Sequence, residues 1–207
     1  MIQPNLIQND IIQEYTLYPK LFDYLKSIQI HSKRIDDKKS SKSTKGSNHW
    51  MFPDLVGLKV LSKNWDLGLK EFSKLHPVKF VEFWSFEVKV KIDISNAREY
   101  FFQAVSNSSW ANSGYLVASE IDNKRRDEIL EELMILSGLH GIGLIELNIK
   151  EPSFSKITIP AREKKEEDWN IMSRLSNNTD FSEYIKDIKE FCETGNIKNL
   201  TSNWDIK

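Results

Sequence analysis

The chain has few residues that could cross-link it or bind zinc. Its 207 residues include one cysteine, Cys192, and four histidines that lack the spacing of zinc ligands. A single cysteine excludes an intramolecular disulfide and a cysteine-rich zinc site. Scarce cysteine is typical of proteins from reducing compartments, so we expect a cytoplasmic protein.

Long apolar runs are missing as well. No apolar stretch is long enough to span a bilayer, and the first residues lack the basic and apolar regions of a signal peptide. We therefore expect no membrane partner. The chain also lacks a glycine-rich phosphate loop and a Gly-x-Ser-x-Gly elbow, which excludes the chemistry that depends on either motif.

Neither sign of charge dominates. The 29 Lys and Arg residues nearly balance the 30 Asp and Glu residues, giving a formal net charge of -1. Such a chain has no general positive potential, so any contact with nucleic acid must depend on local basic patches. With 40% hydrophobic and 29% charged residues the composition is globular, and the length suits a single domain over residues 1–207.

Hydrophobic patterning predicts alternating helices and strands. We expect an N-terminal helix within residues 1–30, a basic loop over 31–50, a core over 51–150 and a C-terminal helical extension over 151–207. The predicted strands span 54–61, 78–92, 114–120 and 142–147, and the predicted helices span 67–74, 96–110, 126–139, 168–175 and 181–191. This alternation predicts an α/β fold of the α+β kind, in which helices flank a mixed β-sheet.

Two acidic residues are predicted to meet across a pair of strands. Asp54 begins an apolar strand, where an ionised carboxylate needs a cation or hydrogen-bond donors. If the two strands pair antiparallel with Val60 opposite Val81, then Asp54 lies opposite Glu87. This register stacks apolar pairs and also brings the carboxylates together, so it predicts a metal site.

Lys89 shares a strand face with Glu87. An ordinary amphipathic strand with Glu87, Lys89 and Lys91 on its outer face is the alternative explanation of these residues. Val81 and Phe83 occupy the same face upstream, however, which indicates a buried face and favours a functional site.

The residues around this pair resemble a known enzyme superfamily. The segments Met51-Phe52-Pro53-Asp54 and Phe86-Glu87-Val88-Lys89 resemble the paired motifs of the PD-(D/E)xK nucleases, which have the restriction-endonuclease-like fold. The run Gln103-Ala104-Val105-Ser106-Asn107-Ser108-Ser109-Trp110-Ala111-Asn112 is similar to the nuclease-like domain of HrgA-type proteins. These form a bacterial family associated with restriction and modification loci. The resemblance runs from Glu14 to the region of Phe181.

The resemblance implies a metal-dependent nuclease that hydrolyses phosphodiester bonds. It implies that Asp54, Glu87 and the carbonyl of Val88 hold Mg²⁺ or Mn²⁺. It also implies that Lys89 holds or polarises the attacking water. DNA is the implied substrate, in a restriction or phage-defence setting, and a homodimer is left open as the form of assembly.

Two further residues are catalytic candidates. Gln103 belongs to a polar stripe on the helix predicted over 96–110, which either braces the core or borders a site. In the superfamily a glutamine at a similar place often borders the metal, which favours the second explanation. Glu14, on the N-terminal helix, resembles the acidic residues that several members bring toward the metals, and a solvated surface glutamate is the alternative.

A basic segment precedes Asp54. Its lysines are candidates for contacts with the phosphate backbone, which position nucleic acid without reading its sequence. A loop that serves only solubility is the alternative. The candidates for nucleic-acid contacts are Lys38, Lys39, Lys42, Lys45, Asn48 and Asn107.

These observations favour a Mg²⁺-dependent endodeoxyribonuclease. One alternative is a catalytically inactive nuclease-fold module that serves nucleic-acid binding or complex assembly. Asp54, Glu87 and Lys89 are all present, which argues against it, because degenerate members commonly lose one of them. Another alternative is a metal-dependent hydrolase of a different phosphoester, for which a closed pocket is expected instead of a wide, positively lined cleft.

Overall fold

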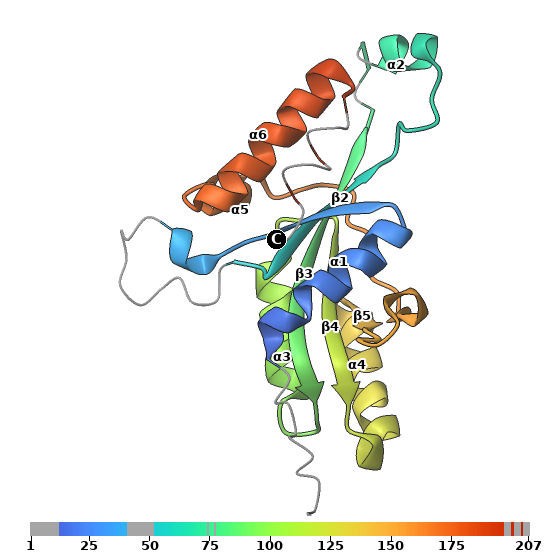
Figure 1. Ribbon diagram of the computed structural model, residues 1–207, viewed down its shortest axis with the longest axis vertical. Coiled ribbons are helices and arrows are strands. Elements are labelled where there is room, and N and C mark those ends of the chain that lie inside the picture. The colour runs from blue at the N-terminus through green and yellow to red at the C-terminus, as the bar shows by residue number, and fades with distance from the viewer. Residues whose placement is uncertain are drawn as a thin grey trace, which may run out of the picture.

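The computed structural model describes residues 13–40, 52–73, 75–76, 78–196, 200 and 204. In this part of the chain, six strands form one mixed sheet in the order β1-β2-β3-β4-β5-β6 (Figure 1). The strands are β1 (Ile30–Arg34), β2 (Leu55–Val60), β3 (Val81–Ile92), β4 (Ser113–Ile121), β5 (Gly143–Glu146) and β6 (Lys156–Ile159). Strands β3, β4 and β5 run parallel to one another, and the β1–β2, β2–β3 and β5–β6 pairs are antiparallel. The expected α/β fold with a mixed sheet is confirmed.

Helices cover both faces of this sheet. They are α1 (Tyr18–Ser27), α2 (Leu67–Ser73), α3 (Ala97–Asn107), α4 (Arg126–His140), α5 (Trp169–Leu175) and α6 (Thr179–Thr194). Parallel neighbours need long crossovers, and α3 and α4 supply them between β3, β4 and β5. Figure 1 shows α3 and α4 along the lower part of the sheet, and α5 and α6 beside its upper part. None of the described helices is both long enough and apolar enough to cross a membrane.

The position of Glu87 follows from how the two faces are covered. Phe86 faces α1 on one side of the sheet. On the other side, Phe83 packs with residues of α6, and Leu116 of β4 packs with residues of α3 and α4. Glu87 shares this second side with Phe83, because alternate residues of a strand share a face, and it pairs with Leu116 in the β3–β4 register. Glu87 therefore lies where the two groups of helices meet.

The expected register of β2 and β3 is confirmed. Val60 is opposite Val81, and Leu58 is opposite Phe83. The ladder continues to Leu55 opposite Phe86, which leaves Asp54 next to Glu87 just beyond the paired residues. Apolar pairing on a buried face fixes such a register, because a slip of one residue would turn every side chain to the other face.

A helix lies within residues 1–30 as expected, whereas the segment that follows it differs from the expectation. Helix α1 begins at Tyr18 with Pro19 in its first turn, after a short 3-10 helix η1 (Glu14–Thr16). The segment 31–50 is not a loop throughout, because it starts within strand β1 and continues into the 3-10 helix η2 (Asp37–Lys39). Its polar composition conceals the strand: Lys33 is buried because its ammonium pairs with Glu183 of α6 at 2.9 Å.

The C-terminal part is also not helical throughout. The short strand β6 lies within residues 151–207 and extends the sheet at its far edge. Helices α5 and α6 are confirmed, and Asp168 and Asn178 cap their N-termini through side-chain oxygens. Helix α4 ends at Gly141, whose φ of 81° is the left-handed conformation that glycine adopts readily.

Candidate metal centre

Asp54 is held at the junction of three strands. Its backbone N–H donates to the carbonyl of Phe86 in β3 at 3.1 Å, and its own carbonyl accepts from the N–H of Ile35 at 3.0 Å. Its carboxylate accepts from the N–H of Val88 at 2.8 Å and from the hydroxyl of Tyr18 at 3.2 Å. The carboxylate is therefore fixed beside β3 by backbone geometry and not by a flexible loop.

Glu87 is the second carboxylate of the site, and its side chain is only 7% exposed. One oxygen lies 2.8 Å from the ammonium of Lys89, and the other accepts from the side-chain amide of Asn107 at 2.7 Å. Buried charges are stable only when paired or hydrogen-bonded, and both conditions are met here. Asn107 of α3 therefore anchors the carboxylate from behind.

Lys89 pairs with two acidic groups. Its ammonium lies 3.8 Å from Glu14 as well as 2.8 Å from Glu87, and it lies over the ring of Tyr100 at 5.2 Å from the centroid. Burial alone would lower its pKa, but the charges of Glu87, Asp54 and Glu14 outweigh this effect and raise the pKa of Lys89 above its ordinary value. Lys89 is therefore a stable cation at neutral pH.

The carboxylates are crowded enough to hold a proton. Burial, followed by the charge of Glu87, raises the pKa of Asp54 from 3.8 to about 8, although the N–H of Val88 opposes this. Burial also raises the pKa of Glu14, and burial with the charge of Asp54 raises the pKa of Tyr18 well above its ordinary value. Tyr18 therefore keeps its proton and donates to Asp54, and negative charge outweighs positive charge at the site.

These groups line one cavity of about 490 Å³, which we call the acidic pocket. Its lining includes six carboxylates and only two cationic side chains. The acidic side chains are Glu14, Asp36, Asp37, Asp54, Glu87 and Glu99, and the cationic ones are Arg34 and Lys89. The pocket is therefore not a positively lined cleft, and an anionic substrate needs additional cations to enter it.

The donor atoms of the acidic pocket fit a hard divalent cation. Asp54 and Glu87 offer carboxylate oxygens, and Val88 places its backbone beside Asp54. Within the described residues, no group of three or more His, Cys, Asp or Glu side chains could hold a metal by itself. A Mg²⁺-like ion suits this set, because it retains several waters and accepts few protein ligands. Asn107 Oδ1, buried and without a donor among the described residues, offers such a water an acceptor.

The other predicted catalytic residues also border the acidic pocket. Glu14 lines it from η1 and approaches Lys89. Gln103 lines it from α3, but its amide bonds Glu99 at 3.4 Å instead of the Glu87–Lys89 pair. Asn107, which we expected at the nucleic-acid surface, is 4% exposed and holds Glu87. Asn107, and not Gln103, is therefore the residue of α3 that hydrogen-bonds the carboxylate of Glu87.

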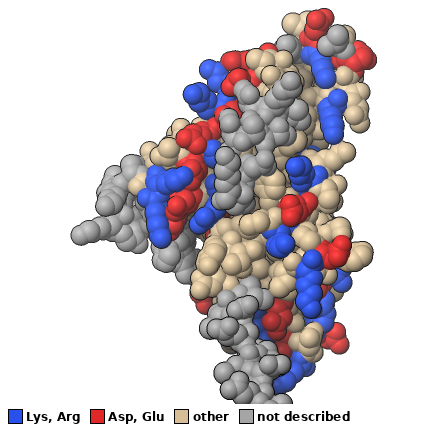
Figure 2. Space-filling view, in the orientation of Figure 1, with Lys and Arg blue, Asp and Glu red and all other residues tan. Residues whose placement is uncertain are grey.

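The residues predicted to contact nucleic acid do not gather at the acidic pocket in the part of the chain that the structure describes, apart from Asn107. Lys42, Lys45 and Asn48 lie outside the described residues. Lys38 is exposed on η2, whereas the ammonium of Lys39 is 2.8 Å from Asp180 of α6. Figure 2 shows lysine and arginine interspersed with aspartate and glutamate over the visible face. Lys39 thus serves a contact within the fold, as Lys33 does.

Tyr18 and Arg34 belong to the acidic pocket but were not predicted. Tyr18 fits the apolar spacing of the first helix, which indicates packing and not a polar contact, yet its hydroxyl donates to Asp54. Arg34 lay in the segment expected to be a loop, yet it ends β1 and lines the acidic pocket. An alternation signal in the segment from Ile30 to Arg34 could have found the strand, had its buried side chains been apolar.

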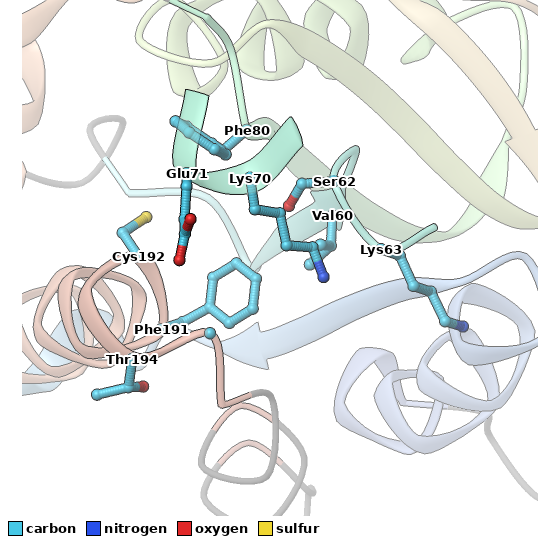
Figure 3. Close-up of a pocket in the computed structure, with 10 residues that line it drawn as sticks. Val60, Ser62, Lys63, Lys70, Glu71, Phe80, Phe191, Cys192 and Thr194 are labelled. Carbon is cyan, nitrogen blue, oxygen red and sulfur yellow. The ribbon is translucent and has the colours of Figure 1, made fainter. Parts of the chain in front are cut away.

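A second cavity, of about 440 Å³, lies between the end of β2, helix α2 and the end of α6. Figure 3 shows the ring of Phe191 facing Lys70 and Glu71 across it. This cavity shares no lining residue with the acidic pocket. Of the predicted site residues that the structure describes, none lines this second cavity, whereas Glu14, Asp54, Glu87, Lys89, Gln103 and Asn107 line the acidic pocket.

Comparisons with known proteins give little more. No protein-family model matches the chain, and no curated protein matches it in sequence. One solved structure, the SPO1766 protein of unknown function from Silicibacter pomeroyi, is similar with 13% sequence identity and a TM-score of 0.44. The match covers 90% of this chain and 94% of the other. A likeness at this TM-score carries no argument about function.

Proposed function

We propose that the protein is a metal-dependent nuclease that hydrolyses phosphodiester bonds in DNA. The observation that carries this proposal is the convergence of Asp54, Glu87 and Lys89 in one acidic pocket. Asp54 and Glu87 come from adjacent strands, and the ammonium of Lys89 lies 2.8 Å from Glu87. Two carboxylates and a cation held by strand backbones are a preorganised arrangement for phosphoryl chemistry.

The residues divide the work as follows. Asp54, Glu87 and the carbonyl of Val88 would hold a Mg²⁺ or Mn²⁺ ion, which when bound would supply charge neutralisation at the phosphoryl oxygens and lower the pKa of water. Lys89 orients the attacking water and offsets negative charge that develops in the transition state. Asn107 fixes the direction of Glu87, and Glu14 keeps Lys89 in place from the opposite side.

Charge balance supports the dependence on metal. A phosphodiester is an anion, and the acidic pocket presents six carboxylates against two cations. Without additional positive charge the phosphate is repelled, since like charges in a partly desolvated site interact strongly. The raised pKa of Asp54 agrees with this deficit, because burial and the charge of Glu87 favour the protonated carboxyl although Lys89 opposes them.

The biological setting comes from sequence resemblance. The run from Gln103 to Asn112 resembles HrgA-type proteins, and it ends α3 and begins the approach to β4. On that resemblance we propose a cytoplasmic role in restriction or phage defence.

One observation favours a second candidate, an inactive nuclease-fold module that binds nucleic acid or assembles with a partner. All four carboxylate oxygens of Asp54 and Glu87 are already engaged by Tyr18, Val88, Lys89 and Asn107. Such a network is stable without a metal. The two candidates therefore differ in whether a cation competes successfully with these protein donors.

A cleavage assay with a matched variant decides between them. Purified protein is incubated with plasmid DNA, single-stranded DNA and RNA in Mg²⁺, in Mn²⁺ or in chelator, beside the variant Glu87→Gln. We expect cleavage of DNA that requires the metal and that Glu87→Gln loses. Calorimetric titration with Mn²⁺ should show binding to the wild type that is weakened in the variant. Absence of both metal binding and cleavage in the wild type supports the inactive module.

A further inference from the structure

Arg34 has an unusual place at the mouth of the acidic pocket. It is the last residue of β1, so its backbone is fixed by pairing with Leu55 of β2. Its guanidinium lies 5.0 Å from the ring centroid of Tyr18, the residue whose hydroxyl contacts Asp54. The side chain is nevertheless exposed to solvent and lines the acidic pocket. A rigid backbone and an aromatic support hold this cation beside the candidate metal centre.

Arg34 is also the cation of the acidic pocket that remains available. The side chain of Lys89 is 14% exposed and is engaged by Glu87 and Glu14. Within the part of the chain that the structure describes, Arg34 forms no ion pair, whereas neighbouring Lys33 pairs with Glu183. The two cations therefore differ, because Lys89 is already paired with carboxylates and Arg34 is the more exposed of the two.

The chemistry of Arg34 suits phosphate. A guanidinium presents a planar fork of donors that matches phosphate oxygens and binds them in a bidentate manner. Arg34 lies opposite Leu55 of β2, which lies opposite Phe86 of β3. The backbone of Lys89 is therefore two strand spacings across the sheet and three residues further along β3, ~14 Å away. A phosphate at Arg34 is therefore a different one from the phosphate next to Lys89.

We propose that Arg34 forms a phosphate subsite that binds a neighbouring phosphate of the nucleic-acid strand whose scissile phosphate lies at Asp54 and Glu87. This inference rests on the proposed nuclease function and adds a binding residue to it. Arg34 offsets the repulsion of the phosphates by the carboxylates of the acidic pocket, which include Asp36 and Asp37. It also holds the nucleic-acid strand in a path across β2. Backbone phosphates are common to all sequences, so Arg34 contributes affinity and not sequence preference.

The test measures how salt affects DNA binding. The wild type and the variants Arg34→Gln and Arg34→Lys are titrated with a short fluorescein-labelled DNA, single-stranded and duplex, in Ca²⁺ at several KCl concentrations. The control is Arg125→Gln, which removes the same charge from an exposed arginine that pairs with Glu128 outside the acidic pocket. Circular dichroism verifies folding, and Arg34→Lys keeps a cation over Tyr18 if Arg34→Gln is unstable.

We expect Arg34→Gln to weaken DNA binding about tenfold, as for the loss of a charge-assisted contact. The slope of log K against log[salt] should become shallower by about 0.7–0.9, the value for one phosphate contact. Arg34→Lys should keep the slope and lose part of the affinity, and in Mg²⁺ the KM of Arg34→Gln should rise more than its kcat falls. Arg125→Gln should behave as the wild type.

Two results would overturn the inference, and they are distinguishable. If the wild type cleaves DNA with metal but Arg34→Gln matches Arg125→Gln in affinity and slope, the phosphate subsite is wrong and the nuclease proposal stands. If the wild type neither binds Mn²⁺ nor cleaves any nucleic acid, both proposals fail together.

Discussion

The side-chain amide of Asn107 donates to the buried carboxylate of Glu87 at 2.7 Å. Asn107 is itself fixed, because its backbone carbonyl accepts from the indole of Trp110 at 2.9 Å and from the hydroxyl of Ser85 at 3.0 Å. The end of α3 is thus joined to β3 by two hydrogen bonds, one to Glu87 and one from Ser85. Partners that orient a metal ligand commonly influence affinity nearly as much as the ligand itself.

Asn107→Leu should therefore weaken both Mn²⁺ binding and DNA cleavage, each by about 10–100-fold, because Glu87 loses the donor that orients it. Gln103→Ala is the control, since Gln103 lines the same pocket from the same helix but bonds Glu99. Calorimetry and a plasmid assay measure the two effects below the melting temperature of each variant. Equal losses in both variants would contradict the role of Asn107.

Lys89→Met should remove most cleavage while Mn²⁺ binding is retained. Lys89 is assigned to the water and the transition state, so the expected loss in kcat is on the order of 100-fold or more. Without metal the variant should also melt at a lower temperature, because Glu87 loses its partner at 2.8 Å. Lys91→Met is the control, since Lys91 lies two residues along β3, is exposed and pairs with Glu120. Unchanged cleavage by Lys89→Met would remove Lys89 from the mechanism.

The metal-free protein should lose stability as pH rises from about 4 to about 8. The pKa of Asp54 is raised from 3.8 to about 8 in the folded state. Between these values the folded carboxyl holds a proton that the unfolded chain has released, so protonation favours folding and the benefit disappears through the folded pKa. Each pH unit within this window should cost at most about 1.4 kcal/mol, or roughly 3–6 °C in melting temperature.

Asp54→Asn should flatten this pH profile, because the titrating group is gone. Melting curves in chelator between pH 5 and pH 9 compare the two proteins at about unit intervals. Added Mn²⁺ should stabilise the wild type most at high pH, since the proton must leave before the cation binds. A wild-type profile that rises with pH in chelator would show that Asp54 is ionised in the folded protein.

Replacing Asp180 should lower the free energy of unfolding more than replacing Glu183, although each carboxylate pairs with a lysine, Lys39 and Lys33 respectively. Asp180 is 7% exposed and accepts from the N–H of Asp36 and the ammonium of Lys39. Its replacement by alanine leaves the half-buried N–H of Asp36 without this partner, at a cost of about 1–3 kcal/mol. The side chain of Glu183 is 57% exposed, so Glu183→Ala should cost about 0–1 kcal/mol. Urea denaturation of both variants checks this order.

The sequence determined the pairing of the central strands. Val60 opposite Val81 and Leu58 opposite Phe83 follow from apolar residues two apart, because one face must be buried. The same reasoning brought Asp54 next to Glu87. The helices α4, α5 and α6 were predictable too, from the spacing of their apolar residues.

Only the tertiary structure decided which polar residues meet the carboxylates. Helical spacing places Gln103 and Asn107 on one face of α3, so it does not tell which of them contacts Glu87. Packing of α3 on the sheet turned Asn107 toward Glu87. Strand β1 was hidden because its buried residue Lys33 is polar and finds a partner on α6, far away in sequence. Contacts between residues distant in sequence leave no local pattern, so neither Arg34 nor Tyr18 was predictable as part of the acidic pocket. Periodicity reports which face is buried, and the identity of the partner depends on the fold.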